Sequence, residues 1–137
     1  MNKQAGRRDI ARTISLLWRQ PEAPSGRRGP KPALSTDTVV DAAIEVADAN
    51  PTTPLSMRMI GDHLGRTAMS LYTYIPGKDE LLDLMYDRVH AELPPIADTG
   101  DWRMALSDWA AALFALNTRH PWTLDVSLAR PVLGPHE

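Results

Sequence analysis

The stretch "LSMRMIGDHLGRTAMSLYTYIPGKDELLDLM", residues 55–85, decides the fold that the chain should adopt. Ser56 can cap a short helix, "MRMIGDHL", which Gly65 ends after about two turns because glycine readily adopts the left-handed conformation of a helix C-terminus. Thr67 is the expected cap of a second short helix over about 67–74. Three or four residues around Gly65 join the two helices, so the stretch predicts a helix-turn-helix.

Such a motif needs apolar residues that hold the second helix in place while its other face stays exposed. Ile60, Leu64 and Leu71 suit that role. Gly61 has no side chain, which would allow the two helices to approach closely. Pro76-Gly77 ends the second helix. A bare pair of short helices is a weak signal by itself, because many all-α proteins contain one.

The sequence outside this stretch shows helical rather than strand periodicity. Ser35 or Thr36 can cap a helix within "LSTDTVVDAAIEVADAN", whose apolar residues recur at the helical spacing. Three further helices are expected in "KDELLDLMYDRVHAEL", "DWRMALSDWAAALFALNTRH" and "PWTLDVSLA". No strand alternation and no internal repeat is found, so the predicted fold class is all-α.

The charge is distributed unevenly along the chain. Residues 1–34 hold eight Lys/Arg and two Asp/Glu, whereas residues 35–137 hold seven and fifteen. A basic arm on an acidic body is typical of proteins that bind nucleic acid or an anionic surface, although a solvated tail that binds nothing has the same composition. Within the arm, "IARTISLLWR" can form a short amphipathic helix that docks on the body, on DNA or on a membrane surface, and "PEAPSGRRGPKPAL" reads as an extended linker.

Composition excludes several classes of protein. The 137 residues contain no cysteine, which excludes disulfides and thiolate metal sites and fits a cytoplasmic location. No segment approaches the roughly 18 apolar residues of a membrane span, and Arg12 and Arg19 interrupt any signal peptide. The scattered histidines show no metal-site spacing, and no nucleophile–base arrangement or phosphate-binding glycine loop is present. We therefore expect no enzyme activity, no metal and no cofactor.

The detailed spacing in residues 55–85 resembles the DNA-binding motif of the tetracycline-repressor (TetR) family of bacterial regulators. That pattern combines a leucine with Ser/Thr, an arginine, an apolar residue, Leu-Gly, Leu-Tyr, an aromatic residue or histidine, and a lysine before Leu-Leu. Here the corresponding residues are Leu55, Ser56, Arg58, Ile60, Leu64-Gly65, Leu71-Tyr72, Tyr74, Lys78 and Leu81-Leu82. The resemblance covers residues 34–93 most clearly, and "RHPWTLDV…RPVLGP" looks like the start of the regulatory domain in one branch of the family.

The resemblance implies DNA-contact roles for residues of the motif. Tyr72 and Tyr74 correspond to positions that touch the DNA backbone, and Lys78 to a lysine that holds a phosphate together with the free N–H groups of its helix. Other residues at positions that can reach phosphate, a base edge or the groove are Ser56, Arg58, Arg66, Thr67, Ala68, Met69, Ser70 and Thr73. Arg27, Arg28 and Lys31 of the arm are expected to contact the minor groove or phosphates.

Simpler interpretations remain open for several of these residues. Tyr72 and Met69 could be packing residues, Arg66 a solvated charge, and the basic residues of the arm part of a spacer. The second helix of the motif also carries no Asn, Gln or Arg. Strong bidentate recognition of bases would therefore have to come from Arg58 or Arg66, which leaves base specificity open but not DNA binding.

The resemblance implies a ligand-responsive repressor that binds a palindromic operator in double-stranded DNA as a homodimer and releases it when a small-molecule effector binds. The expected division is a basic arm over residues 1–33, a helix-turn-helix domain over 34–80, and a connecting helix with the start of a ligand-binding and dimerisation domain over 81–137. Two helices cannot enclose a drug-sized pocket, so that last part is expected to be incomplete. The alternatives are an interaction or membrane-surface module that uses the amphipathic N-terminal helix, an activator, and a DNA binder of low specificity.

Overall fold

The computed structural model describes residues 10–20, 34–127 and 131–136, and this part of the chain is helical without strands. The all-α prediction is confirmed. Arg27, Arg28 and Lys31 lie outside the described residues. The helices are α1 (Ile10–Leu17), α2 (Thr36–Ala49), α3 (Met57–Leu64), α4 (Ala68–Leu71), α5 (Lys78–His90), α6 (Trp102–Arg119) and α7 (Thr123–Ser127).

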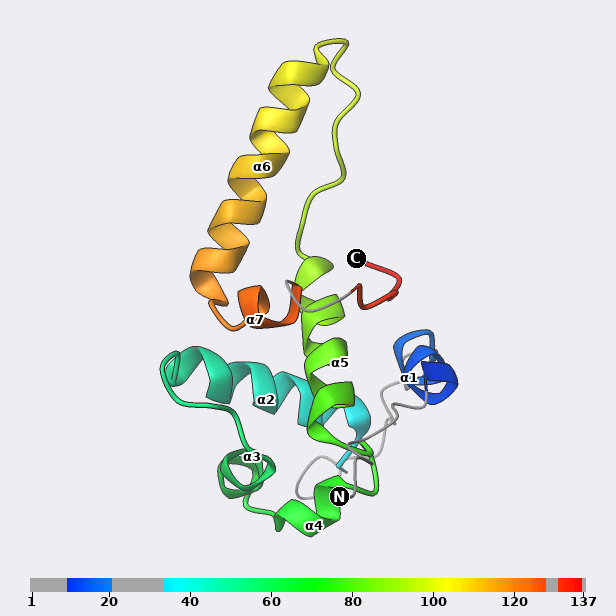
Figure 1. Cartoon of the computed structure of the whole chain (residues 1–137), viewed down its shortest axis with the longest axis vertical. Helices are drawn as coiled ribbons and strands as arrows, with labels where there is room; N and C mark the ends of the chain where they lie inside the picture. Colours follow the sequence, from blue (N-terminus) through cyan, green and yellow to red (C-terminus); the bar gives the residue numbers. More distant parts are fainter. Residues whose placement is uncertain (1–9, 21–33, 128–130, 137) are drawn as a thin grey trace, which may run out of the picture.

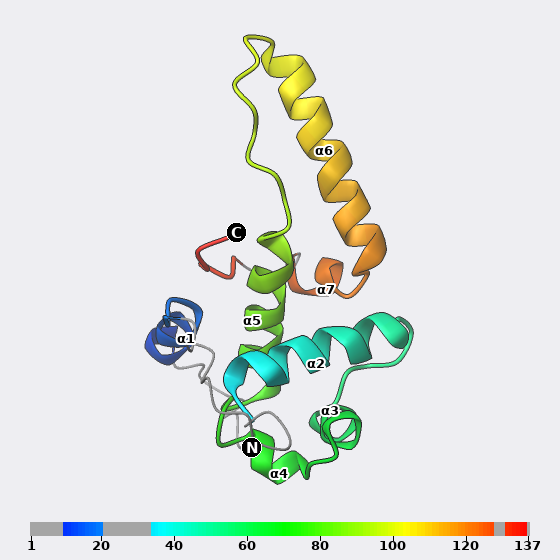
Figure 2. The ribbon, with the colours of Figure 1, turned by 180° about the vertical axis from the view of Figure 1, so that it is seen from behind.

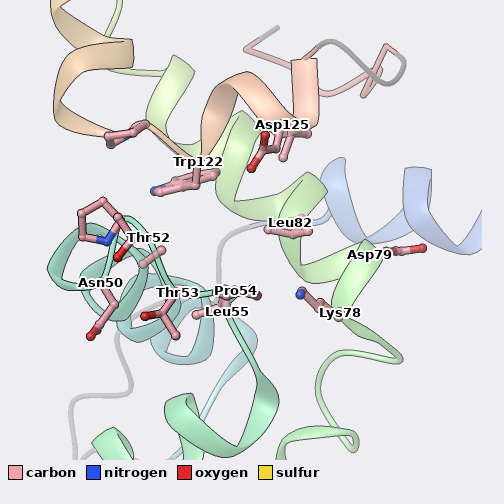
Figure 3. Close-up of a pocket in the computed structure, with 14 residues that line it drawn as sticks. Asn50, Thr52, Thr53, Pro54, Leu55, Lys78, Asp79, Leu82, Trp122 and Asp125 are labelled. Carbon is pink, nitrogen blue, oxygen red and sulfur yellow. The ribbon is translucent and has the colours of Figure 1, made fainter.

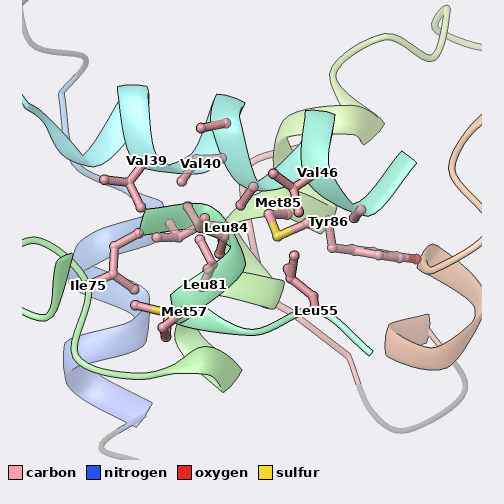
Figure 4. Close-up of a cluster of buried hydrophobic side chains, with 14 of the residues drawn as sticks. Val39, Val40, Val46, Leu55, Met57, Ile75, Leu81, Leu84, Met85 and Tyr86 are labelled. Atoms are coloured by element: carbon pink, nitrogen blue, oxygen red, sulfur yellow. The ribbon is translucent and has the colours of Figure 1, made fainter. Parts of the chain in front are cut away.

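The core forms where α2 crosses α5, and α3 and α4 close its lower end (Figure 1). Helix α2 begins at Ser35, whose side chain accepts a hydrogen bond from the Thr38 N–H at 3.1 Å. Val39 and Val40 of α2 are buried against Leu81 and Met85 of α5 (Figure 4). The apolar faces predicted from the sequence therefore meet each other, and burial of these faces supplies most of the stability of such short helices.

Helix α1 packs against α5 and does not protrude from the body (Figures 1 and 2). Its buried residues are Thr13 and Leu17. Helical spacing predicts one apolar stripe of Ile10, Ile14, Leu17 and Trp18, but Ile10 and Trp18 are about two thirds exposed, at 65% and 61%. The predicted stripe was therefore wrong in detail, because the docked face is rotated toward Thr13. The indole N–H of Trp18 donates to the carbonyl oxygen of Leu133 at 3.0 Å.

Salt bridges centred on Asp37 join α1, α2 and α5. Arg19, which follows α1, and Arg88 of α5 both donate to one carboxylate oxygen of Asp37. Arg88 also reaches Asp41 at 2.7 Å, so the cation bridges two acids of one α2 face. Because these groups are only partly buried, we regard the bridges as orienting contacts more than as a large source of stability.

Two helices are shorter than the sequence pattern indicates. The second helix of the motif was expected over about 67–74, but α4 covers Ala68–Leu71 and continues as a turn, with the Tyr74 N–H bonded to the Leu71 carbonyl oxygen at 2.9 Å. Pro76 lies five positions beyond Leu71 and directly restricts only Ile75, so it ends this turn and not α4 itself. Helix α5 likewise ends at His90, just ahead of Pro94-Pro95.

Helix α6 extends away from α2 and α5 (Figures 1 and 2). Helical spacing predicts one apolar face of α6 that consists of Trp102, Leu106, Trp109, Leu113 and Leu116. Of these only Leu116 is buried, together with Ala105. Trp109 is half-buried, whereas Trp102 and Phe114 are 65% and 76% exposed. Large apolar side chains on α6 thus face solvent in this structure.

Candidate nucleic-acid interface

Helices α3 and α4 have the caps that the sequence predicts. The Ser56 side chain accepts from the Met59 N–H at 3.3 Å and caps α3. Gly65 ends α3 in the left-handed conformation, with φ 63°. The Thr67 side chain then accepts from the Ser70 N–H at 3.3 Å and caps α4. These local hydrogen bonds set the short turn between the two helices.

Gly61 is where α3 and the turn before α4 approach most closely. A Cβ atom at this position would lie 2.7 Å from the carbonyl oxygen of Arg66 and 3.2 Å from the nitrogen of Ala68. Both neighbours are backbone atoms and cannot move aside as a flexible side chain could. The close approach predicted for Gly61 is confirmed, and it fixes α4 against α3.

The predicted backing residues hold α4 from inside. Ile60 and Leu71 are fully buried, and Leu64 packs against the same cluster while partly exposed. Ile75, which was not predicted for this role, is also fully buried. Leu71 is the only one of these on α4 itself. It orients the short helix so that the opposite side faces solvent.

The outer face of α4 consists of Met69, Tyr72 and Thr73. Met69 is 78% exposed and Tyr72 is 45% exposed, so neither is a core residue. Ser70 is half-buried and donates through Oγ to the Thr67 carbonyl oxygen at 2.7 Å. Its hydroxyl is therefore engaged by its own helix, while Met69, Tyr72 and Thr73 remain open to a partner.

Two residues of the predicted set lie closer to the core than expected. Ala68 and Tyr74 are half-buried and pack against the hydrophobic cluster. The Tyr74 ring thus has a packing role as well as any outward contact of its hydroxyl. The family resemblance had implied outward contacts for both residues, on a helix expected to continue to position 74.

Lys78 is exposed and is the first residue of α5. Gly77 precedes it as the N-cap and provides no side-chain hydrogen bond to the helix end. The N–H groups of the first turn lack the usual side-chain cap, and an anion is stabilised at such a position by these donors and the helix dipole. Lys78 and this helix end lie directly after the turn that follows α4.

The arginines of the motif stand at its edge. The Arg58 side chain is 88% exposed, and its Nε is 3.9 Å from the Asp62 carboxylate, too far for a hydrogen bond. Arg66 is exposed in the turn. Both side chains are thus available at the surface and are not held in one orientation by a close ion pair.

A cavity of about 490 Å³ lies between the α2–α3 connection, the start of α5 and α7 (Figure 3). Lys78, Trp122 and Asp125 line it together with the prolines and threonines of residues 51–54. Sequence reasoning did not identify this cavity. Pro51 and Pro54 indicated only a chain break, and nothing local shows that α7 returns to face them.

Within the described ranges, no group of three or more His, Cys, Asp or Glu residues is arranged to hold a metal ion. None of the described helices combines the length and apolar character that crossing a membrane requires. The described histidines contact carboxylates or backbone: His63 lies 2.9 Å from Glu45, and His90 lies 2.8 Å from the Tyr86 carbonyl oxygen. Two short capped helices joined by a tight turn, the second with an exposed outer face, place the chain in the helix-turn-helix class.

Sequence comparison with known proteins supports the helix-turn-helix class. The chain is 53% identical over 133 residues to the HTH-type transcriptional repressor DrrR1 of Streptomyces coeruleorubidus, an alignment of 96% of this chain and 48% of that protein. It is 36% identical over 121 residues to an HTH-type transcriptional regulator of Saccharopolyspora erythraea, which covers 88% of this chain and 50% of the relative. No family model matches the sequence.

Solved structures give the same result. Apo ActR from Streptomyces coelicolor matches with a TM-score of 0.70 at 30% identity, over 78% of this chain and 52% of ActR. The same TetR family protein in complex with actinorhodin matches with a TM-score of 0.69, over 77% and 50% of the two chains. The chain belongs to the TetR family of helix-turn-helix regulators. It spans about half the length of the curated relatives that it matches.

Proposed function

We propose that this chain is the DNA-binding part of a ligand-responsive transcriptional repressor that binds a palindromic operator as a homodimer. The observation that carries the proposal is the arrangement of α4. Leu71 fixes the helix from inside, Met69, Tyr72 and Thr73 face solvent, and Lys78 stands at the uncapped start of α5. This arrangement suits a helix in the major groove with a phosphate held beside it.

Different residues of this surface serve different kinds of contact. Tyr72, Tyr74 and Lys78 contact phosphates, with Arg58, Arg66, Ser56 and Thr67 at the margins. Met69 and Thr73 lie in the groove, where a methyl-bearing side chain can contact a thymine methyl group. Arg27, Arg28 and Lys31 add contacts from the N-terminal arm. Phosphate contacts position the protein, and only the groove contacts carry sequence information.

Residues 34–80 form the DNA-binding domain in this proposal, and residues 81–137 begin a regulatory domain. Support for a small-molecule effector comes from ActR, which has been solved with actinorhodin and with (S)-DNPA. The effector lowers DNA affinity by favouring a conformation in which α4 and Lys78 no longer fit the operator together. Reciprocity then requires that the operator also weakens effector binding.

Selection of bound duplexes from a random pool, followed by titration of the enriched duplex, tests the DNA-binding proposal. We expect an inverted repeat to be enriched and bound with two protomers per duplex. Addition of actinorhodin as a first probe tests whether a small molecule lowers the affinity for this duplex. A protein that binds neither the random nor the enriched pool would contradict the proposal.

A DNA binder of low sequence preference is the second candidate, and one observation favours it. The exposed face of α4 has no Asn, Gln or Arg, and the Ser70 hydroxyl is bonded to the Thr67 carbonyl oxygen. Specific and low-specificity binding differ in the ratio of affinities for selected and random duplexes. A ratio near one, with DNA binding retained, identifies the low-specificity binder.

A further inference from the structure

The junction of α6 and α7 is a fixed corner, defined here as residues 117–123. Thr123 is fully buried, and its hydroxyl lies 2.7 Å from the side-chain oxygen of Asn117 and 2.6 Å from the carbonyl oxygen of His120. Pro121 lies inside the corner and restricts its backbone further. The end of α6 and the start of α7 should therefore move together.

Asp48 of α2 contacts two side chains of this corner, those of His120 and Trp122. Nδ1 of His120 lies 2.9 Å from both carboxylate oxygens of Asp48, and Nε1 of Trp122 lies 2.9 Å from Oδ1. A carboxylate can only accept hydrogen bonds, so both rings donate. The His120 side chain is 10% exposed and that of Asp48 is 29% exposed. We call Asp48, His120 and Trp122 the Asp48 clamp.

Asp48 lies at the end of α2, close to the connection that leads to α3. Helix α2 ends one residue later, and residues 50–55 lead directly to Ser56, the cap of α3. Residues 51–54 are exposed and line the cavity opposite Trp122 (Figure 3), but Leu55 is buried in the core, and α3 packs directly against α2. From Ser56 onward, the tight approach at Gly61 locks α4 to α3. A shift of α2 at Asp48 would thus be carried to α4.

We propose that the Asp48 clamp couples the α6–α7 corner to the helix-turn-helix, as a second connection besides α5. This inference rests on the proposed DNA-binding function. Helix α5 positions Lys78, whereas the clamp positions the end of α2 and, through α3, the outer face of α4. A displacement of the corner changes the orientation of α4 relative to Lys78. Asp48, His120 and Trp122 are positioning residues that act without touching DNA.

Hydrogen exchange of the protein with and without its selected duplex tests the coupling without an effector. Because coupling between two sites is reciprocal, DNA bound at α4 should slow amide exchange at the α6–α7 corner, by about fivefold or more. Trp122→Phe removes one donor and retains an aromatic ring, and Asp48→Ala removes the acceptor. Trp102→Phe is the matched control, since Trp102 is 65% exposed on α6 away from the clamp.

We expect the DNA-induced protection of the corner to disappear in Asp48→Ala and to weaken in Trp122→Phe, while Trp102→Phe retains it. Protection of α3 and α4 by DNA should persist in every folded variant. If Asp48→Ala does not fold, Trp122→Phe alone decides. Unchanged protection of the corner in Trp122→Phe would then overturn the inference, as would a wild-type protein that binds DNA without any protection there. Absence of DNA binding by the wild type would instead refute the proposed function.

Discussion

At the scale of single residues, the structure separates side chains that hold the motif from those that face outward. Leu71 and Tyr72 are neighbours in sequence, yet Leu71 is fully buried and Tyr72 is 45% exposed. Met69, which could have been a packing residue, is 78% exposed. Side-chain burial thus distinguishes the supporting residue Leu71 from the contacting positions Met69 of α4 and Tyr72, the residue that follows the helix.

Tyr72→Phe should weaken binding to all DNA sequences alike, by about 1–2 kcal/mol for the removal of one phosphate hydrogen bond. Lys78→Ala should have a similar effect, since it removes a charge at the uncapped start of α5. Titration of selected and random duplexes measures both. The control Arg103→Ala removes a charge from α6, where Arg103 stacks on Trp102, and should leave DNA affinity unchanged. Equal affinities of Tyr72→Phe, Lys78→Ala and wild type would contradict docking through α4.

Gly61→Ala should lower the free energy of unfolding by about 1–3 kcal/mol, because the added methyl group overlaps backbone atoms. Urea denaturation measures this change. Gly100→Ala is the control: Gly100 has φ 75° and open space around it, so the substitution brings only backbone strain in a connection remote from α4. DNA affinity should fall in Gly61→Ala and not in Gly100→Ala. If Gly61→Ala had the free energy of unfolding and the DNA affinity of the wild type, the close approach of α3 and α4 at Gly61 would be contradicted.

At the scale of elements, α1 is the helix whose position the sequence left most open. An isolated helix of this length is marginal in water, and three docking surfaces were open to it. The structure places it on α5, with Leu17 in the core and Arg19 bound to Asp37. Of the apolar side chains that the membrane-surface alternative would use, Leu17 is buried in the docked face, whereas Ile10 and Trp18 remain exposed.

Leu17→Ala should cost about 2–5 kcal/mol, the range for truncating a buried leucine. The control is Ile10→Ala on the same helix. Because Ile10 is 65% exposed, this substitution should change the free energy of unfolding by less than about 0.5 kcal/mol. Urea denaturation of both variants measures the difference. Equal stabilities would mean that α1 does not dock on α5 in solution.

At the scale of the whole molecule, the acidic body and the basic arm have separate tasks in the proposed function. The N-terminal segment also contains α1, so its deletion would remove Leu17 from the core along with the basic residues. Substitution of the basic residues alone avoids that complication.

The triple variant Arg27→Gln, Arg28→Gln and Lys31→Gln should reduce the slope of log affinity against log salt by about 0.9 for each DNA phosphate that the arm no longer neutralises. Titrations of one duplex at several salt concentrations measure the slope. Far-UV circular dichroism and the unfolding midpoint should match the wild type, because no helix of the described structure is changed. An identical slope would assign these residues to a spacer.

The sequence by itself determined the helices, their caps and the helix-turn-helix. These features depend on residues close together in the chain: Ser56, Gly65 and Thr67 each act through backbone groups within a few positions. The resemblance of the spacing around Leu71, Tyr72 and Lys78 to the TetR-family motif likewise identified the helix-turn-helix class. The sequence pattern placed the ends of two helices too late, because the apolar pattern continues through the turns that follow Leu71 and His90.

Only the tertiary structure decided which surfaces meet. The docking of α1 on α5, the half-burial of Ala68 and Tyr74, and the contact of Asp48 with His120 and Trp122 join residues on different elements. Asp48 is separated from each of these two rings by more than 70 positions in the chain. No local propensity encodes such contacts, since they arise when apolar faces of several helices exclude water together and the polar groups at their edges find partners.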